Sequence, residues 1–191
     1  MKYKVLEDGT IVTLRAPTVE DQLGSLRFFR NLPVEDRQYL RVDVTRVDVV
    51  KRRLEQAESG AVTRILALDG DEIIADGALE YSNDEWSSHI GEIRVIVARE
   101  YQKLGIGTHL IELLFHVAEK RNLEKIVMKM ASPQTSIRTV CEKLGFRVDA
   151  TLPNYVSDLD GESQSLIIMT CVLDEWFREM KGYYVENNWD G

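Results

Sequence analysis

The sequence predicts one α/β (α+β) domain, in which a mixed, mostly antiparallel sheet is flanked by helices. Three observations predict this class. Short alternating apolar runs suit strands, amphipathic runs between them suit helices, and one apolar strand leads through a glycine turn directly into a helix. The chain has 191 residues, 44% of them hydrophobic and 4 of them proline, and no composition shift marks a linker. This length suits a single domain with a full core.

The chain begins with a predicted β-hairpin. Alternating apolar residues over Tyr3–Leu6 and Ile11–Leu14 flank the dipeptide Asp8-Gly9. Aspartate and glycine together favour a tight turn, because both tolerate left-handed backbone. We therefore expect two antiparallel strands here.

Two helices are predicted next. Thr18, with Asp21 three residues later, is a typical helix start, and Pro33 ends that helix. Its expected apolar face consists of Leu23, Leu26 and Phe29. A second amphipathic run spans about Val47–Glu58 and ends at Gly60.

Three strands are predicted in the middle of the chain. Thr63–Leu68 and Ile73–Tyr81 are apolar runs on either side of an Asp-Gly-Asp turn, and Ile90–Val97 follows a polar loop. Because the connections are short, we expect antiparallel neighbours.

The C-terminal half predicts one right-handed βαβ unit and a further hairpin. Apolar residues recur at helical spacing from Ile106 to Val117, and Lys125–Met130 is expected to run parallel to Ile90–Val97 after that helix. The remaining elements expected are a helix over Gln134–Leu144, strands over Phe146–Leu152 and Ser165–Leu173, and a helix from Asp174 to about Glu186.

Composition excludes several classes of partner. Against 24 Lys and Arg stand 32 Asp and Glu, a net charge of −8, so we expect neither nucleic acid nor an anionic membrane as a partner. No apolar run approaches a membrane span and Met1–Asp8 lacks signal-peptide features, so we expect a cytoplasmic protein. Cys141 and Cys171 lie in apolar segments without metal-ligand spacing, and we expect buried free thiols.

The segment Glu92–Leu110 is the most informative. An apolar strand runs there into a turn containing Gly105 and Gly107, and this turn opens an amphipathic helix. The first N–H groups of a helix lack intrahelical partners and carry about half a positive charge, so phosphates bind where small residues let them approach. The pattern predicts a site for a phosphorylated cofactor.

Spacing decides which phosphate loop this is. A Walker loop requires Gly-Lys-Ser/Thr, whereas Gly107 is followed by Thr108, and a Rossmann fingerprint requires a third glycine where Leu110 stands. The remaining pattern, Gln-x-x-Gly-x-Gly at Gln102, Gly105 and Gly107, resembles the acyl-CoA pyrophosphate loop of the GCN5-related N-acetyltransferase (GNAT) superfamily.

A second motif supports this resemblance. Glu-Lys-Leu-Gly145-Phe146 looks like the signature at the end of that family's fourth helix, and the element order resembles the GNAT fold over about residues 3–173. The resemblance implies a sheet of about seven strands, splayed at the acyl-CoA site and flanked by about four helices. We expect residues 1–173 to form the domain and residues 174–191 a C-terminal helical extension.

The resemblance also implies acetyl-CoA as cosubstrate and no metal. Pantetheine would hydrogen-bond like an extra strand in a gap between Ile90–Val97 and Lys125–Met130, and the loop amides would hold the pyrophosphate. The residues expected to bind the cofactor are Val95, Ile96, Val97, Gln102, Lys103, Leu104, Gly105, Ile106, Gly107, Thr108 and Gln134.

The expected catalytic residue is Glu92. The family's reaction is direct attack of an amine on the thioester, and an uncharged lysine-type amine near pH 7 costs about 4–5 kcal/mol, so a base lowers the barrier. Glu92 resembles the general base of the lysine acetyltransferase branch. Arg94 shares its strand face and could pair with it, which would weaken it as a base.

The expected proton donor to the thiolate is absent. Where many family members carry a tyrosine, this chain has Cys141, which we assign to the core, and Gln134 stands in place of the usual asparagine. The leaving thiolate does not require a dedicated acid.

The resemblance implies an amine as acceptor. The segments Leu26–Asp36, Leu40–Thr45, Ile73–Tyr81, Gly91–Ile93 and Gln102–Leu110 together resemble bacterial protein lysine acetyltransferases that act on acyl-CoA synthetases, which implies a protein lysine. A small molecule, a protein N-terminus and a non-catalytic acyl-CoA sensor are the alternatives. The aromatic tail Trp176–Trp189 leaves a homodimer open.

Overall fold

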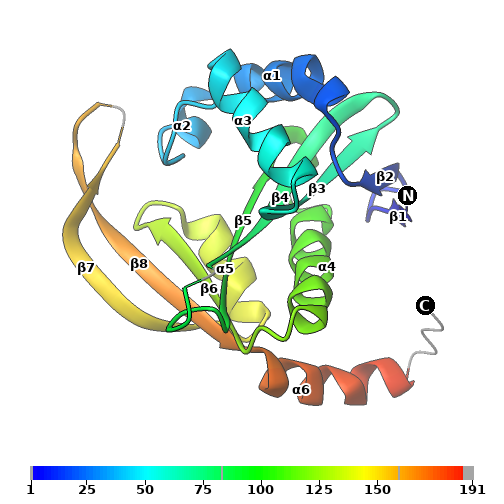
Figure 1. The fold of residues 1–191 in the computed structure, drawn as a ribbon, viewed down its shortest axis with the longest axis vertical. Helices are drawn as coiled ribbons and strands as arrows, with labels where there is room; N and C mark the ends of the chain where they lie inside the picture. Colours follow the sequence, from blue (N-terminus) through cyan, green and yellow to red (C-terminus); the bar gives the residue numbers. More distant parts are fainter. Residues whose placement is uncertain (1, 83, 159, 187–191) are drawn as a thin grey trace.

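A computed structural model describes the backbone of residues 2–82, 84–158 and 160–186, and it has the predicted fold class (Figure 1). In the described residues the sheet has eight strands in the order β1-β2-β3-β4-β5-β6-β8-β7. Its strands are β1 (Lys2–Val5), β2 (Ile11–Arg15), β3 (Val62–Asp69), β4 (Glu72–Tyr81), β5 (Ile90–Val97), β6 (Lys125–Ala131), β7 (Arg147–Ser157) and β8 (Ser163–Val172). The α-helices are α1 (Gln22–Asn31), α2 (Val34–Arg37), α3 (Val47–Glu58), α4 (Ile106–Lys120), α5 (Thr135–Lys143) and α6 (Leu173–Glu186).

Neighbouring strands are antiparallel except for β5 and β6, which are parallel. The described strands number eight instead of about seven, since both strands of the N-terminal hairpin join the sheet. The short helix α2 was not predicted, and it begins directly after Pro33, whose fixed φ suits the start of a helix.

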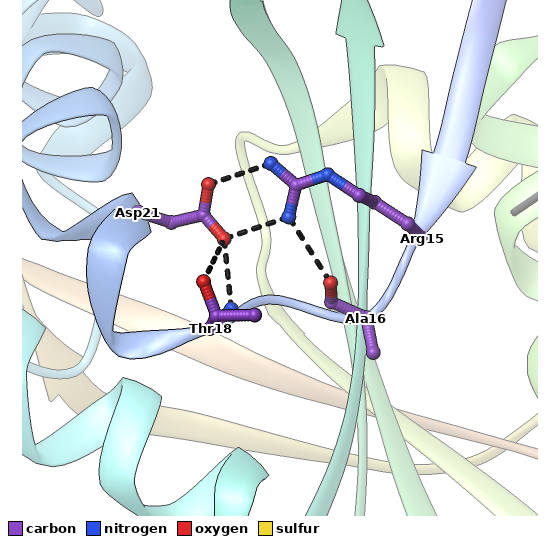
Figure 2. Close-up of polar contacts among 4 residues, drawn as sticks. All are labelled: Arg15, Ala16, Thr18 and Asp21. Atoms are coloured by element: carbon purple, nitrogen blue, oxygen red, sulfur yellow. Dashed lines mark hydrogen bonds and ion pairs between the residues drawn. The ribbon is translucent and has the colours of Figure 1, made fainter.

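The end of β2 is tied to the start of α1 by a charged pair (Figure 2). Both oxygens of Asp21 accept hydrogen bonds from the guanidinium of Arg15, each at 2.7 Å, and the N–H of Thr18 donates to the same carboxylate at 2.8 Å. The hydrogen bond from Arg15 lowers the pKa of Asp21. Thr18 precedes a 3-10 turn over Val19–Asp21, and the α-helix itself begins at Gln22, three residues later than the sequence predicted.

The helices cover both faces of the sheet. Helices α1 and α3 pack on one face, where Phe29 and Leu54 share a core cluster with Leu66 of β3. Helix α4 packs on the opposite face, against Leu79 and Ile93. Leu23 does not join the α1 core as expected, because it is 75% exposed and the buried face consists of Ser25, Leu26, Phe28 and Phe29. A spacing of three residues drifts around a helix of 3.6 residues per turn, which places Leu23 outside the buried stripe.

The C-terminal helix α6 packs on the domain through its first turns. Trp176 is buried, and its ring meets that of Phe115 in α4 edge to face at 4.8 Å between centroids. Trp176 and Phe177, the first aromatic residues of the tail, thus belong to the same core. Trp189 lies outside the described residues.

Candidate active site

The strands β5 and β6 separate where the site was expected. In the described chain they pair from Ile90–Glu92 against residues 125–127, while β5 continues to Val97 and β6 to Ala131. A cavity lies at this divergence, and residues of both strands line it: Ile93, Val95 and Ile96 with Arg94 from β5, and Met128, Lys129 and Met130 from β6. The cavity therefore lies beside the two strands where they separate.

Three of the expected cofactor-binding residues, Val95, Ile96 and Gln134, line this cavity. Gln134 stands immediately before α5, and its side-chain oxygen accepts a hydrogen bond from the N–H of Ala131 at 2.8 Å. This bond fixes the end of β6 to the start of α5. The asparagine-to-glutamine difference from the family pattern thus leaves a polar side chain that holds the cavity wall.

Of the other expected cofactor residues, Val97 ends β5, Gln102 to Gly105 lie in the turn after it, and Ile106, Gly107 and Thr108 begin α4. The side-chain amide of Gln102 donates to the carbonyl of Val97 at 3.1 Å, which closes the turn on its own strand. Lys103 and Gly105 have left-handed backbone, with φ of 62° and 85°, and α4 begins directly after Gly105. This curvature turns the chain so that the amides at the start of α4 can face one ligand.

Side chains in this turn are divided between core and surface. Ile106 is buried in the core and Leu104 packs partly against it, so only their backbone groups can serve a ligand. A Cβ at Gly107 would lie 3.6 Å from Val97 of β5, so the turn is closely packed on its strand. Within the described residues no side chain caps α4. Left-handed glycine, uncapped amides and Lys103 fit a diphosphate.

Glu7 is an unexpected neighbour of the turn. Its N–H donates to the carbonyl of Leu104 at 3.4 Å, and its carboxylate oxygen lies 3.6 Å from the position that a Cβ would take at Gly105. This negative charge opposes a bound diphosphate, so the backbone donors have to outweigh it.

Glu92 lies at the apex of the divergence, in contact with three cations that line the cavity. One of its carboxylate oxygens meets Lys129 at 2.9 Å, and the other contacts both Arg41 and, at 3.4 Å, Arg94. The side chain is 17% exposed. Burial raises the pKa of Glu92, but the hydrogen bond from Lys129 and the three positive charges outweigh it, and the pKa lies below its ordinary value.

Arg94 does pair with Glu92, as its position two residues away suggested, but its stronger partner is Glu80 at 2.9 Å. Glu80 stands directly opposite Glu92 in the register of β4 and β5. Like charges at such a position repel each other, so the guanidinium between them stabilises the pair.

A second charged cluster lies deeper, on the same face of the sheet. Asp76 of β4 and Arg64 of β3 are both buried and form an ion pair, and Arg53 of α3 approaches the same carboxylate at 3.5 Å. The Arg53 guanidinium also lies over the ring of Phe29, 5.1 Å from its centroid. Arg53 and Asp76 line the cavity, so this cluster forms part of its wall.

Replacing Asp76 by Asn is expected to destabilise the fold by about 3–5 kcal/mol, because the buried guanidinium of Arg64 and the partly buried one of Arg53 lose their carboxylate. Urea unfolding of the variant measures this change. Asp48→Asn is the matched control, since Asp48 pairs with Arg46 on the surface and its replacement should leave the unfolding midpoint close to that of the parent protein. Equal midpoints for the two variants would contradict the role given to Asp76.

Cys141 lies in the core, as assigned. It is fully buried, its sulfur is 3.4 Å from that of Met128, and burial raises the pKa of its thiol to about 12. Cys171 is also a buried free thiol.

Sequence reasoning missed Arg41, Lys129 and the Asp76 cluster. Charged residues within apolar strand sequences, such as Arg64 and Asp76, were the available signal, because a buried strand tolerates a charge only when it is paired. No sequence signal pointed to Arg41, which lies in the segment between α2 and α3.

Among the described residues, no group of three or more His, Cys, Asp or Glu side chains is arranged to hold a metal ion. None of the helices in the described part of the chain combines the length and apolar character needed to cross a membrane.

Solved structures with this fold include acetyltransferases. Ribosomal-protein-alanine N-acetyltransferase from Brucella melitensis is 17% identical, with a TM-score of 0.72 over 84% of this chain and 99% of that one. The yncA structure from Salmonella typhimurium, which holds its cofactor acetyl-CoA, is 16% identical, with a TM-score of 0.73 over 85% and 94%. A spermidine N-acetyltransferase chimera from Vibrio cholerae and hSSAT is 19% identical, with a TM-score of 0.72 over 87% and 98%.

The family follows from a match along the sequence itself. The model of the acetyltransferase (GNAT) family matches residues 26–146, which include β5, the glycine turn, α4 and α5 and make up more than half of the chain. The match thus covers the diverging strands and the glycine turn together. This chain belongs to the acetyltransferase (GNAT) family and is an acyl-CoA-dependent N-acetyltransferase that uses acetyl-CoA.

Proposed function

We propose that the chain moves an acetyl group from acetyl-CoA to a primary amine by direct attack of the amine on the thioester, with Glu92 as general base. The observation that carries this proposal is the cavity between β5 and β6, with Glu92 touching three of its lining residues at the apex. A carboxylate beside a channel between two separated strands is well placed to meet an amine at the end of an extended thiol arm.

The proposed cofactor path follows β5. The diphosphate would bind the turn Gln102–Thr108, chiefly through backbone N–H groups. The pantetheine arm would lie beside Val95, Ile96 and Val97 and hydrogen-bond to the strand, while Gln134 faces it from the start of α5. Since a strand rises about 3.3 Å per residue, Glu92 lies about 17 Å from Val97, and an extended arm would bring the thioester toward Glu92.

The reaction needs little beyond positioning and proton removal. The amine nitrogen bonds to the carbonyl carbon, the C–S bond breaks with its electron pair on sulfur, and the nitrogen's proton passes to Glu92 directly or through water. The lowered pKa keeps Glu92 ionised near neutral pH, which is the form that can accept a proton. The same lowered pKa makes the carboxylate a weaker base.

A protein lysine is the acceptor suggested by the resemblance to lysine acetyltransferases that modify acyl-CoA synthetases. Small amines and protein N-termini are the alternative acceptors, and two of the three structural neighbours are named for acetylating a ribosomal protein's alanine and spermidine. The alternative of a non-catalytic acyl-CoA sensor would require that the three cations on the Glu92 carboxylate prevent turnover, which is not expected of a member of this family.

Turnover separates these functions. The enzyme is incubated with acetyl-CoA, candidate acyl-CoA synthetases and a panel of small amines, and the products are analysed for a mass increase of one acetyl group. Acetylation with release of CoA supports the enzyme. Binding of CoA without acetylation of any acceptor would instead support the sensor.

A further inference from the structure

We propose that the acceptor amine carries a negatively charged group, a carboxylate or phosphate, within a few bonds of its nitrogen. This inference rests on the proposed function and adds a substrate class to it. The cations around the cavity would bind the charged group and orient the amine toward Glu92.

The charges at the site do not balance. The two clusters together contain five cations, Arg41, Arg53, Arg64, Arg94 and Lys129, and three carboxylates, Asp76, Glu80 and Glu92, joined by ion pairs. Among the side chains that the structure describes, these clusters therefore carry two positive charges in excess. The whole chain has a net charge of −8, so this local excess is opposite in sign to the rest of the protein.

The excess lies near the reacting end of the channel. Arg94 and Lys129 stand on β5 and β6 within two residues of the last paired positions, whereas the phosphate turn follows the far end of β5. About 17 Å of strand separates Glu92 from that turn. These cations are thus placed to bind a group near the thioester, and the diphosphate has its own site.

The cations retain capacity for a ligand. The side chains of Arg41, Arg94 and Lys129 are 41%, 34% and 35% exposed, and each lines the cavity. An arginine has five N–H donors in a planar fork, more than its present carboxylate contacts use. In the deeper cluster, the Nε of Arg64 is buried without a hydrogen-bond partner among the described residues, which also indicates a shortage of acceptors.

The same excess affects the amine. Nearby positive charges disfavour the ammonium form, so they lower the pKa of an amine held among them and raise the fraction able to attack. They also repel an acceptor with several positive charges. The site therefore favours an amine with its own anion over a polyamine.

Matched acceptors test the inference. Initial rates with acetyl-CoA are compared for β-alanine against propylamine and for phosphoethanolamine against ethanolamine, with spermidine as the polycation. The anionic member of each pair is expected to have a kcat/KM higher by roughly 10- to 100-fold, the range for one charge-assisted hydrogen bond. Peptides with one lysine between two aspartates or between two serines show whether a protein can supply the anion.

Arg41→Gln should raise KM for the anionic amines about tenfold or more and change KM for the neutral amines much less. Arg46→Gln is the matched control, because Arg46 lies in the same connection before α3 and pairs with Asp48 on the surface. A role of Arg41 in folding alone would instead affect both kinds of amine equally.

Several outcomes would overturn the inference. Equal or higher kcat/KM for propylamine, ethanolamine or spermidine would do so, as would selectivity that Arg41→Gln leaves unchanged. If no amine is acetylated, the proposed function fails separately. Calorimetric titration of the enzyme with N-acetyl-β-alanine and with N-propylacetamide then decides the inference alone, with tighter binding of the anion expected and equal binding contradicting it.

Discussion

Glutamate at position 105 is expected to abolish binding of CoA. Gly105 has a φ of 85°, a conformation that side chains rarely adopt, and the new carboxylate would face the proposed diphosphate site. Glu7 already places one negative charge beside this turn. Calorimetry with CoA should show affinity reduced by about 100-fold or more, as expected when one or two charge-assisted hydrogen bonds are lost.

Gly60→Glu controls for backbone strain. Gly60 follows α3, has a comparable φ of 75°, and a Cβ there would meet no atom within 4 Å. This variant introduces the same side chain into the same backbone region away from the turn, and it should bind CoA like the parent protein. If Gly105→Glu binds CoA with the affinity of the parent protein, the turn is not part of the binding site.

Glu92→Gln is expected to lower kcat by roughly 10²- to 10⁴-fold, the usual contribution of a general base. The change keeps the shape of the side chain and removes its ability to take a proton, so binding of CoA should change little. The lowered pKa predicts that Glu92 is already ionised well below neutral pH. A rise of rate with pH in the neutral range therefore belongs to the amine, and both proteins should show it.

Glu80→Gln separates proton removal from the loss of an ion pair. Glu80 stands opposite Glu92 and pairs with the same Arg94, but it does not contact Lys129 or Arg41 in the described structure. Its replacement should reduce kcat much less. If the two variants lose activity equally, Glu92 acts by pairing with the neighbouring cations and is not the base.

Periodicity predicted the elements well because most of them bury one apolar face. The βαβ unit followed from the apolar spacing of α4 between two apolar strands, and the structure confirms the parallel pairing of β5 with β6. The buried stripe of α1 was predicted less well, since Leu23 satisfied the spacing and still faces solvent. Local sequence does not specify where on a helix its packing partner lies.

The charged site was predicted only where its partners are close in sequence. The pairing of Arg94 with Glu92 could be expected because strand residues two apart share a face. Lys129 reaches Glu92 through the register of β5 with β6, and Arg41 reaches it from the segment before α3. Such contacts depend on tertiary structure, so the sequence indicated Glu92 as a candidate base and not the excess of cations around it.

The divergence of β5 and β6 implies that a bound cofactor stabilises the folded enzyme. In the described chain, three residue pairs between β5 and β6 join the two halves of the sheet. A ligand lying between these strands would add contacts to both halves. A ligand that binds the folded but not the unfolded chain raises the free energy of unfolding, by about 2.7 kcal/mol when its concentration is a hundred times Kd. The protein should therefore survive heat and proteolysis longest when acetyl-CoA is abundant, and its lifetime would follow the supply of its own substrate.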